Sequence, residues 1–212
     1  MPGTMGLGLG GFGGVWALMM SAMMLPAVAP VAAAYSRSFM QRRRERLIVF
    51  ASAYLLVWAG SGVVAYPAAL LVDRLTGIST TTARVVAAAA LLGVAAYQLT
   101  PLKRICLDHC RSPLSQLLHY GAFRGRSRDF RVGLHHAAFC LGCCWALMVL
   151  LIVLGTMNAF IMLGIVAFVV LEKYSVHGEL ISRVGAVAAV ALAVVALVVP
   201  QAGLGVGPAT MN

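Results

Sequence analysis

The chain has 212 residues, of which 61% are hydrophobic and only 10% are charged, and its net charge is +10. Soluble domains carry roughly 25% charged residues, so this composition excludes a soluble globular protein. Lipid solvates apolar side chains while helices satisfy their own backbone groups, so we predict an all-α polytopic membrane bundle that forms one domain over residues 1–212. The bases flank apolar runs, as they do where they fix membrane orientation, and no nucleic-acid partner is expected.

Six apolar runs are long enough to cross the roughly 30 Å hydrocarbon core of a bilayer as helices. They cover residues 12–34, 48–71, 83–100, 135–154, 156–172 and 184–200. Only Gly155 separates the fourth run from the fifth. Because one unbroken helix through both runs would be too long for the bilayer, the sequence predicts a tight helical hairpin at this glycine.

Lysine and arginine are concentrated in two connecting segments. Residues 35–47 carry five of them and residues 101–134 carry seven, whereas residues 72–82 carry one. Segments rich in these bases stay on the cytoplasmic side, so six spans place both termini outside. Glu172 and Lys173 end the fifth run, and we interpret them as charges that reach out of the membrane at its cytoplasmic edge.

Residues 101–130 form a non-spanning stretch with a helical pattern. Lys103 contributes to its basic side, and Pro113 interrupts it. The opposite face comprises Leu102, Ile105, Cys106 and His109. This arrangement predicts an amphipathic helix at the cytoplasmic membrane surface, broken near Pro113.

Three cysteines fall within five positions of the fourth apolar run. On a helix, Cys140, Cys143 and Cys144 share a face with His136, and Met148 lies one turn further along its edge. Thiolate, imidazole and thioether donors together suit Cu(I), Zn²⁺ or another thiophilic ion. Simple packing of small side chains and thiol redox chemistry stay open as alternatives.

A second pair of cysteines lies in the non-spanning stretch. Cys106 and Cys110 are one helical turn apart, with His109 between them. A Cys-x-x-x-Cys pair on a helix can hold a soft ion. We therefore predict a cytoplasmic relay site for the metal at these three residues.

The first apolar run contains a group of methionines followed by Pro26. Its members are Met19, Met20, Met23 and Met24. Thioethers bind Cu(I) without carrying a charge, although methionine also fills gaps in cores. We favour Met19, Met23 and Met24 as entry ligands or co-ligands, on a path from outer thioethers to inner thiols. Pro26 predicts a kink in this helix.

These motifs together resemble those of a bacterial family of predicted metal-binding integral membrane proteins, domain of unknown function 2182. The resemblance rests on Trp16 with residues 19–26, residues 97–103 leading to Cys106, residues 110–113, residues 140–148, Gly155 with Met157 and Asn158, and Glu172 with Lys173. It implies a metal-binding protein of a bacterial inner membrane. It implies neither a particular metal nor a mechanism.

The donor set favours a soft-metal protein, with copper as the favoured ion, that takes up, transfers or buffers the ion. Its partners would be the lipid bilayer, the metal ion, and a metallochaperone or a membrane complex. One alternative is a membrane thiol–disulfide oxidoreductase that uses Cys140 and Cys143 as a C-x-x-C pair. Another is a non-catalytic subunit of a larger membrane complex. A role other than catalysis is favoured.

Overall fold

In the computed structural model, the described residues are Thr4 and residues 6–38, 41–111, 113–121, 123–125, 127–154 and 159–199. Within these ranges the chain forms helices and no strand, which confirms the all-α class. The helices are α1 (Leu9–Arg37), α2 (Arg43–Thr76), α3 (Thr80–Gln98), α4 (Pro101–Arg111), α5 (Pro113–Gly121), α6 (Arg128–Leu154), α7 (Ala159–Tyr174) and α8 (Gly178–Val198).

Five of the described helices are long and apolar enough to cross a membrane, namely α1, α2, α3, α6 and α8. Helix α7 has 16 residues. At about 1.5 Å per residue it is roughly 24 Å long, which is shorter than the hydrocarbon core. The expected number of six spans is therefore not confirmed. The predicted hairpin at Gly155, with Met157 and Asn158, lies outside the described residues.

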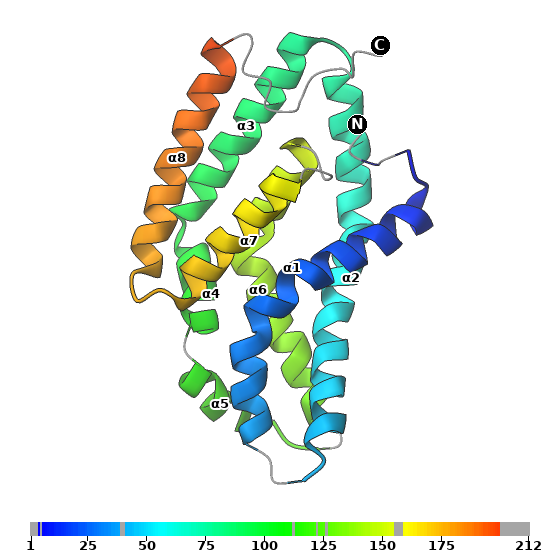
Figure 1. Cartoon of the computed structure of the whole chain (residues 1–212), viewed down its shortest axis with the longest axis vertical. Coiled ribbons are helices and arrows are strands. Elements are labelled where there is room, and N and C mark those ends of the chain that lie inside the picture. Colours follow the sequence, from blue (N-terminus) through cyan, green and yellow to red (C-terminus); the bar gives the residue numbers. More distant parts are fainter. Residues whose placement is uncertain are drawn as a thin grey trace.

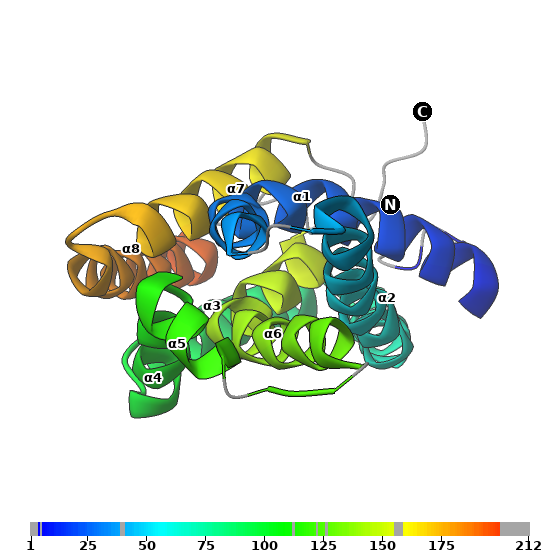
Figure 2. The same ribbon diagram turned by 90° about the horizontal axis from the view of Figure 1, so that it is seen from below.

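Helix α6 is the central element of the fold. More than half of its most apolar stretch is buried inside the protein, against about a third or less for the other four candidate spans. It contacts α2, α3, α4 and α7 (Figure 2). At Gly133 an added Cβ would lie 2.5 Å from the carbonyl oxygen of Phe50, so the missing side chain allows α2 and α6 to cross closely.

Helix α1 bends partway along its length and lies against α2 and α7 (Figure 1). Pro26 and Pro30 are inside this helix, and a proline removes a backbone hydrogen bond and clashes with the preceding turn. Trp16 donates a hydrogen bond to Ser61 of α2 at 3.0 Å, and Tyr174 of α7 donates one to the carbonyl of Ala27 at 2.6 Å. These bonds tie the two halves of α1 to different neighbours.

Helices α4 and α5 meet where the sequence predicted a break. Helix α4 ends at Arg111 and α5 begins at Pro113. The predicted face of α4 is divided, because Leu102 and Ile105 are exposed on the protein whereas Cys106 is buried, and Lys103, which was expected on the basic side, is buried too. The buried side of α4 consists of Lys103, Cys106, Leu107 and Cys110. The helix docks on α6, and its position at a membrane surface stays a prediction.

The last turns of α1, the first turns of α2 and the start of α6 lie at the same end of the bundle (Figure 1). Arg46 of α2 forms an ion pair of 2.9 Å with Asp129 of α6, and Tyr35 of α1 donates a hydrogen bond of 2.6 Å to the same carboxylate. This junction fastens three helices together. Both segments are rich in bases, as expected for one side of a membrane, and which side this is stays a prediction.

Candidate metal centre

Three thiols of α6 lie together in the middle of the bundle. The sulfur atoms of Cys140, Cys143 and Cys144 are all within 4.8 Å of one another. Their residues are 0%, 2% and 1% exposed. The spacing of three and four residues stacks them on one face, and both later thiols donate to the carbonyl oxygen of Cys140, at 3.1 and 2.9 Å. We call these three residues the thiol triad.

The dimensions of the thiol triad fit a soft ion. A thiolate sulfur lies about 2.3 Å from a bound ion such as Zn²⁺, so three sulfurs around one ion are roughly 4 Å apart. The observed limit of 4.8 Å requires only a small closure of the side chains. Thiolates select Cu(I) and Zn²⁺ over the hard cations Mg²⁺ and Ca²⁺.

Cys110 of α4 brings a fourth sulfur close to the thiol triad. The residue is buried in the same apolar core. Its interaction with the thiol of Cys143, followed by burial, raises the pKa of the Cys110 thiol well above its ordinary value. The pair of Cys106 and Cys110 was expected to form a separate relay, but Cys110 belongs to the same buried core as the thiol triad.

Cys106 occupies a different position, one turn before Cys110. It packs on Gly142, where an added Cβ would lie 2.8 Å from its sulfur atom. Burial, followed by the nearby Cys143, raises the pKa of the Cys106 thiol. Gly142 therefore provides the space in which α4 approaches α6 at the level of the thiol triad.

The thiol triad has a buried cation beside it. The ammonium group of Lys173 in α7 donates to the sulfur of Cys140 at 3.0 Å, and the hydroxyl of Tyr54 in α2 lies 3.1 Å from the same sulfur. Lys173 is 3% exposed. Burial of a charge is costly unless an opposite charge compensates it. Among the described residues no carboxylate forms an ion pair with Lys173, and the contact of its ammonium with the Cys140 sulfur puts an ionisable thiol where a counter-charge would lie.

A second buried lysine has its own carboxylate. Lys103 of α4 forms an ion pair of 2.8 Å with Glu172 of α7, and both residues are 1% exposed. The ammonium also donates to the carbonyl oxygen of Cys143, and Gln98 of α3 donates to Glu172 at 3.2 Å. The interpretation of Glu172 and Lys173 as charges that reach out of the membrane is therefore wrong. Ionisable groups at the end of an apolar run are the sequence signal that indicates such a site.

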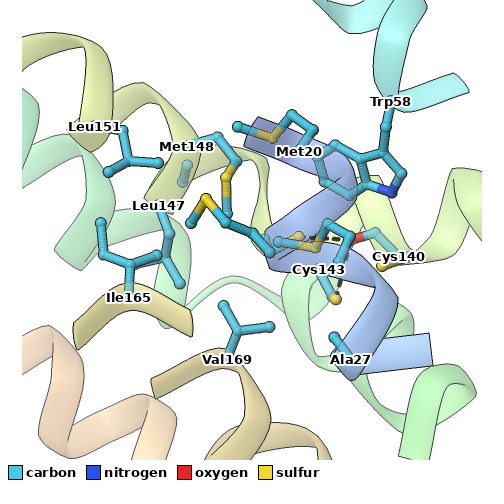
Figure 3. Packing of buried hydrophobic residues seen from close by; sticks show 14 of the residues in the cluster. Met20, Ala27, Trp58, Cys140, Cys143, Leu147, Met148, Leu151, Ile165 and Val169 are labelled. Atoms are coloured by element: carbon cyan, nitrogen blue, oxygen red, sulfur yellow. Dashed lines mark hydrogen bonds between the residues drawn. The ribbon is translucent and has the colours of Figure 1, made fainter. Parts of the chain in front are cut away.

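The methionines of α1 face the same core. Met20 and Met24 are fully buried and Met23 is 3% exposed, whereas Met19 is only partly buried. Figure 3 shows Met20 of α1 in one packed group with Met148, Cys140 and Cys143 of α6. Met20 is thus more buried than Met19, although Met19 was the expected ligand. The run has methionines on adjacent helical faces, so its periodicity alone could not select the buried one.

The two predicted histidine ligands lie apart from the thiol triad. His136 is buried, and its Nδ1 atom is 3.1 Å from the hydroxyl of Tyr120. Its nitrogens are outside the group of ligating atoms that lie within 4.8 Å of one another. His109 stacks on Phe139 with ring centroids 4.0 Å apart. Burial lowers the pKa of His109, which favours the neutral imidazole.

The chain matches the model of the PpoB2 copper chaperone family over residues 13–197. It belongs to this copper chaperone family. No curated protein and no solved structure matches it. The expectation of a metal-related family is confirmed in this broader form, whereas membership of the domain of unknown function 2182 is not confirmed. Among the ions that suit three thiols, the family match therefore favours copper.

Proposed function

We propose that this chain is a membrane copper carrier that holds Cu(I) on the thiol triad and passes it to a partner. The observation that carries the proposal is the contact of 3.0 Å between the buried Lys173 ammonium and the sulfur of Cys140. A cation without a carboxylate favours thiolates beside it, and thiolates are the donors that bind Cu(I). The family match supports copper as the cargo, with Zn²⁺ as the alternative ion.

The charges around the thiol triad support binding of one monovalent ion. Cu(I) with two thiolates carries a net charge of −1, which the ammonium of Lys173 offsets. The neighbouring pair of Lys103 and Glu172 is neutral by itself. A loaded site is thus close to neutral, which is the condition under which a metal complex can be buried at low cost.

The arrangement of ligands supports transfer rather than permanent storage. Cys110 reaches the cluster from α4, whereas the thiol triad is on α6. A ligand on a separate helix allows one sulfur to replace another while the ion stays bound. The buried methionines of α1 and Met148 provide uncharged, weaker donors in the same core. An ion that arrives on these thioethers could therefore pass to the stronger thiolate donors beside them.

Burial argues against the alternative of a thiol–disulfide oxidoreductase. Cys140 and Cys143 are 0% and 2% exposed, so the disulfide of a substrate protein has no access to either sulfur in this conformation. Thiol–disulfide exchange requires direct attack of one sulfur on another. The bacterial inner membrane as location, and a metallochaperone or membrane complex as partner, are parts of the proposal.

A double substitution tests the copper site. Replacement of Cys143 and Cys144 by serine should remove the tightly held, sulfur-ligated equivalent of Cu(I) from protein purified under reducing conditions, because a hydroxyl is a poor donor for a soft ion. The measurement is titration against a competing Cu(I) chelator, with elemental analysis of the purified protein.

The matched control for this test is Cys106→Ser, which changes a buried cysteine outside the thiol triad. This variant should keep the sulfur-ligated equivalent. If the double variant binds Cu(I) as tightly as the original protein, the thiol triad is not the site and the proposed function is wrong.

A further inference from the structure

Three histidines from three different helices meet beside the first turns of α6. His109 belongs to α4, His119 to α5 and His135 to α6. The ring centroids of His119 and His135 are 5.0 Å apart, those of His109 and His135 are 5.3 Å apart, and those of His109 and His119 are 6.2 Å apart. We call these residues the imidazole cluster. Their separation in the sequence hides this group from motif analysis.

Two nitrogens of the imidazole cluster lack a hydrogen-bond partner within the described ranges. They are Nε2 of His109 and Nδ1 of His135, and both atoms are buried. A buried polar atom without a partner costs free energy, and native structures pair the large majority of such atoms. A metal ion is a partner that can satisfy more than one of these nitrogens at once.

Aromatic side chains hold the rings of the imidazole cluster in place. Phe139 stacks on His109 at 4.0 Å and lies 4.9 Å from His135. Phe123 lies 5.7 Å from His135 and 5.8 Å from His119. These contacts form a wall that limits water at the nitrogens, whereas His119 is exposed and provides access from outside.

The spacing of the rings is compatible with a three-histidine metal site. An imidazole nitrogen lies about 2.0–2.1 Å from a bound ion, so the ring centroids around one ion are roughly 5–5.5 Å apart. Two of the three observed separations fall in this range. Within the described residues, the ring nitrogens of the three histidines do not all lie within 4.8 Å of one another. The exposed ring of His119 must therefore turn toward His109 to complete the site.

We propose that His109, His119 and His135 form a second metal site, which takes a copper ion through imidazole nitrogens next to the thiol triad. Only the identity of the cargo rests on the proposed function, since the geometry by itself supports an ion that prefers imidazole. Helix α4 links the two sites, because it packs on α6 and His109 is followed directly by Cys110, which is buried in the same core as Cys143. The imidazole cluster is thus an intermediate binding site through which copper passes between the thiols and the exterior of the bundle.

The test is Cu(I) titration combined with X-ray absorption of the full chain in detergent. The original protein should bind a sulfur-ligated and a nitrogen-ligated ion, which differ in metal–ligand distance by about 0.2–0.3 Å. The variant His109→Gln with His135→Gln should lose the nitrogen-ligated ion and keep the sulfur-ligated one. The matched control is His177→Gln, which changes an exposed histidine at the start of α8 and should keep both ions.

Retention of the nitrogen-ligated ion in the double histidine variant, or its absence from the original protein, would overturn the second site. The variant Cys143→Ser with Cys144→Ser separates this failure from that of the proposed function, because it should keep the nitrogen-ligated ion and lose the other. If that cysteine variant does not fold, the comparison of the histidine variant with His177→Gln still decides the question, since both retain the thiol triad.

Discussion

Lys173 and Arg46 are both cations held between helices, but they have different partners. Arg46 donates to Asp129 through Nη2 at 2.9 Å and through Nε at 2.9 and 3.2 Å. The side chain of Arg46 is 27% exposed and that of Asp129 is 14% exposed. Lys173 is almost fully buried, and the closest partner of its ammonium is the sulfur of Cys140. The first cation has a carboxylate as its partner, whereas the second has a thiol, which becomes an anion only when it loses its proton.

The pair of Lys103 and Glu172 shows that burial alone does not explain this difference. It is as buried as Lys173, yet it contains its own carboxylate and is neutral. Lysine at position 173 therefore adds an uncompensated charge to a region that already has a complete ion pair. A protein that needed only stability could place an apolar side chain there. The free-energy cost of burying the Lys173 ammonium has a purpose if its charge favours the thiolates that bind the metal.

The largest effect is expected for Lys173→Met. Removal of the ammonium leaves the thiolates without their neighbouring cation, so the affinity for Cu(I) should fall by about a hundredfold or more. The fold should persist, because protonated thiols are neutral and pack as small apolar groups. Competition titration with a Cu(I) chelator measures the loss. Lys173→Arg is the control that keeps the charge and should lose less, and equal affinity in the methionine variant would refute the role of Lys173.

The next effect concerns stability at the neighbouring pair. Lys103→Met leaves Glu172 buried without its partner and should lower the free energy of unfolding by about 3–5 kcal/mol. The double variant with Glu172→Gln should recover most of this loss, because no isolated charge is left. Unfolding in mixed detergent micelles provides the measurement. Equal destabilisation of the single and double variants would show that packing, rather than charge, makes position 103 sensitive.

Much of the architecture could be predicted from local sequence patterns. The apolar runs predicted the long helices, and Pro113 predicted the break between α4 and α5. The spacing of Cys140, Cys143 and Cys144 predicted the thiol triad, since residues three and four apart share a helical face. These predictions succeed because each depends on contacts within one helix.

The partners of the thiol triad could not be predicted in this way. Glu172 lies 69 residues after Lys103, and Lys173 lies 33 residues after Cys140. Only the docking of α4 and α7 on α6 brings these groups together. The surroundings of His136 could not be predicted for a related reason: its Nδ1 atom lies 3.1 Å from the hydroxyl of Tyr120 of α5, a contact between helices that the spacing within α6 does not reveal.

The smallest effect is expected at the partly exposed pair. Asp129→Asn keeps the shape of the side chain but removes its charge, which weakens the contacts with Arg46 and Tyr35. Solvent screens this pair, so the loss of stability should be about 1 kcal/mol. The affinity for Cu(I) should not change, because this junction fastens helices at one end of the bundle and does not contact the thiols. A loss of copper as large as that of Lys173→Met would mean that the closure of this end controls the metal site, and the distinction between a structural and a functional cation would no longer hold.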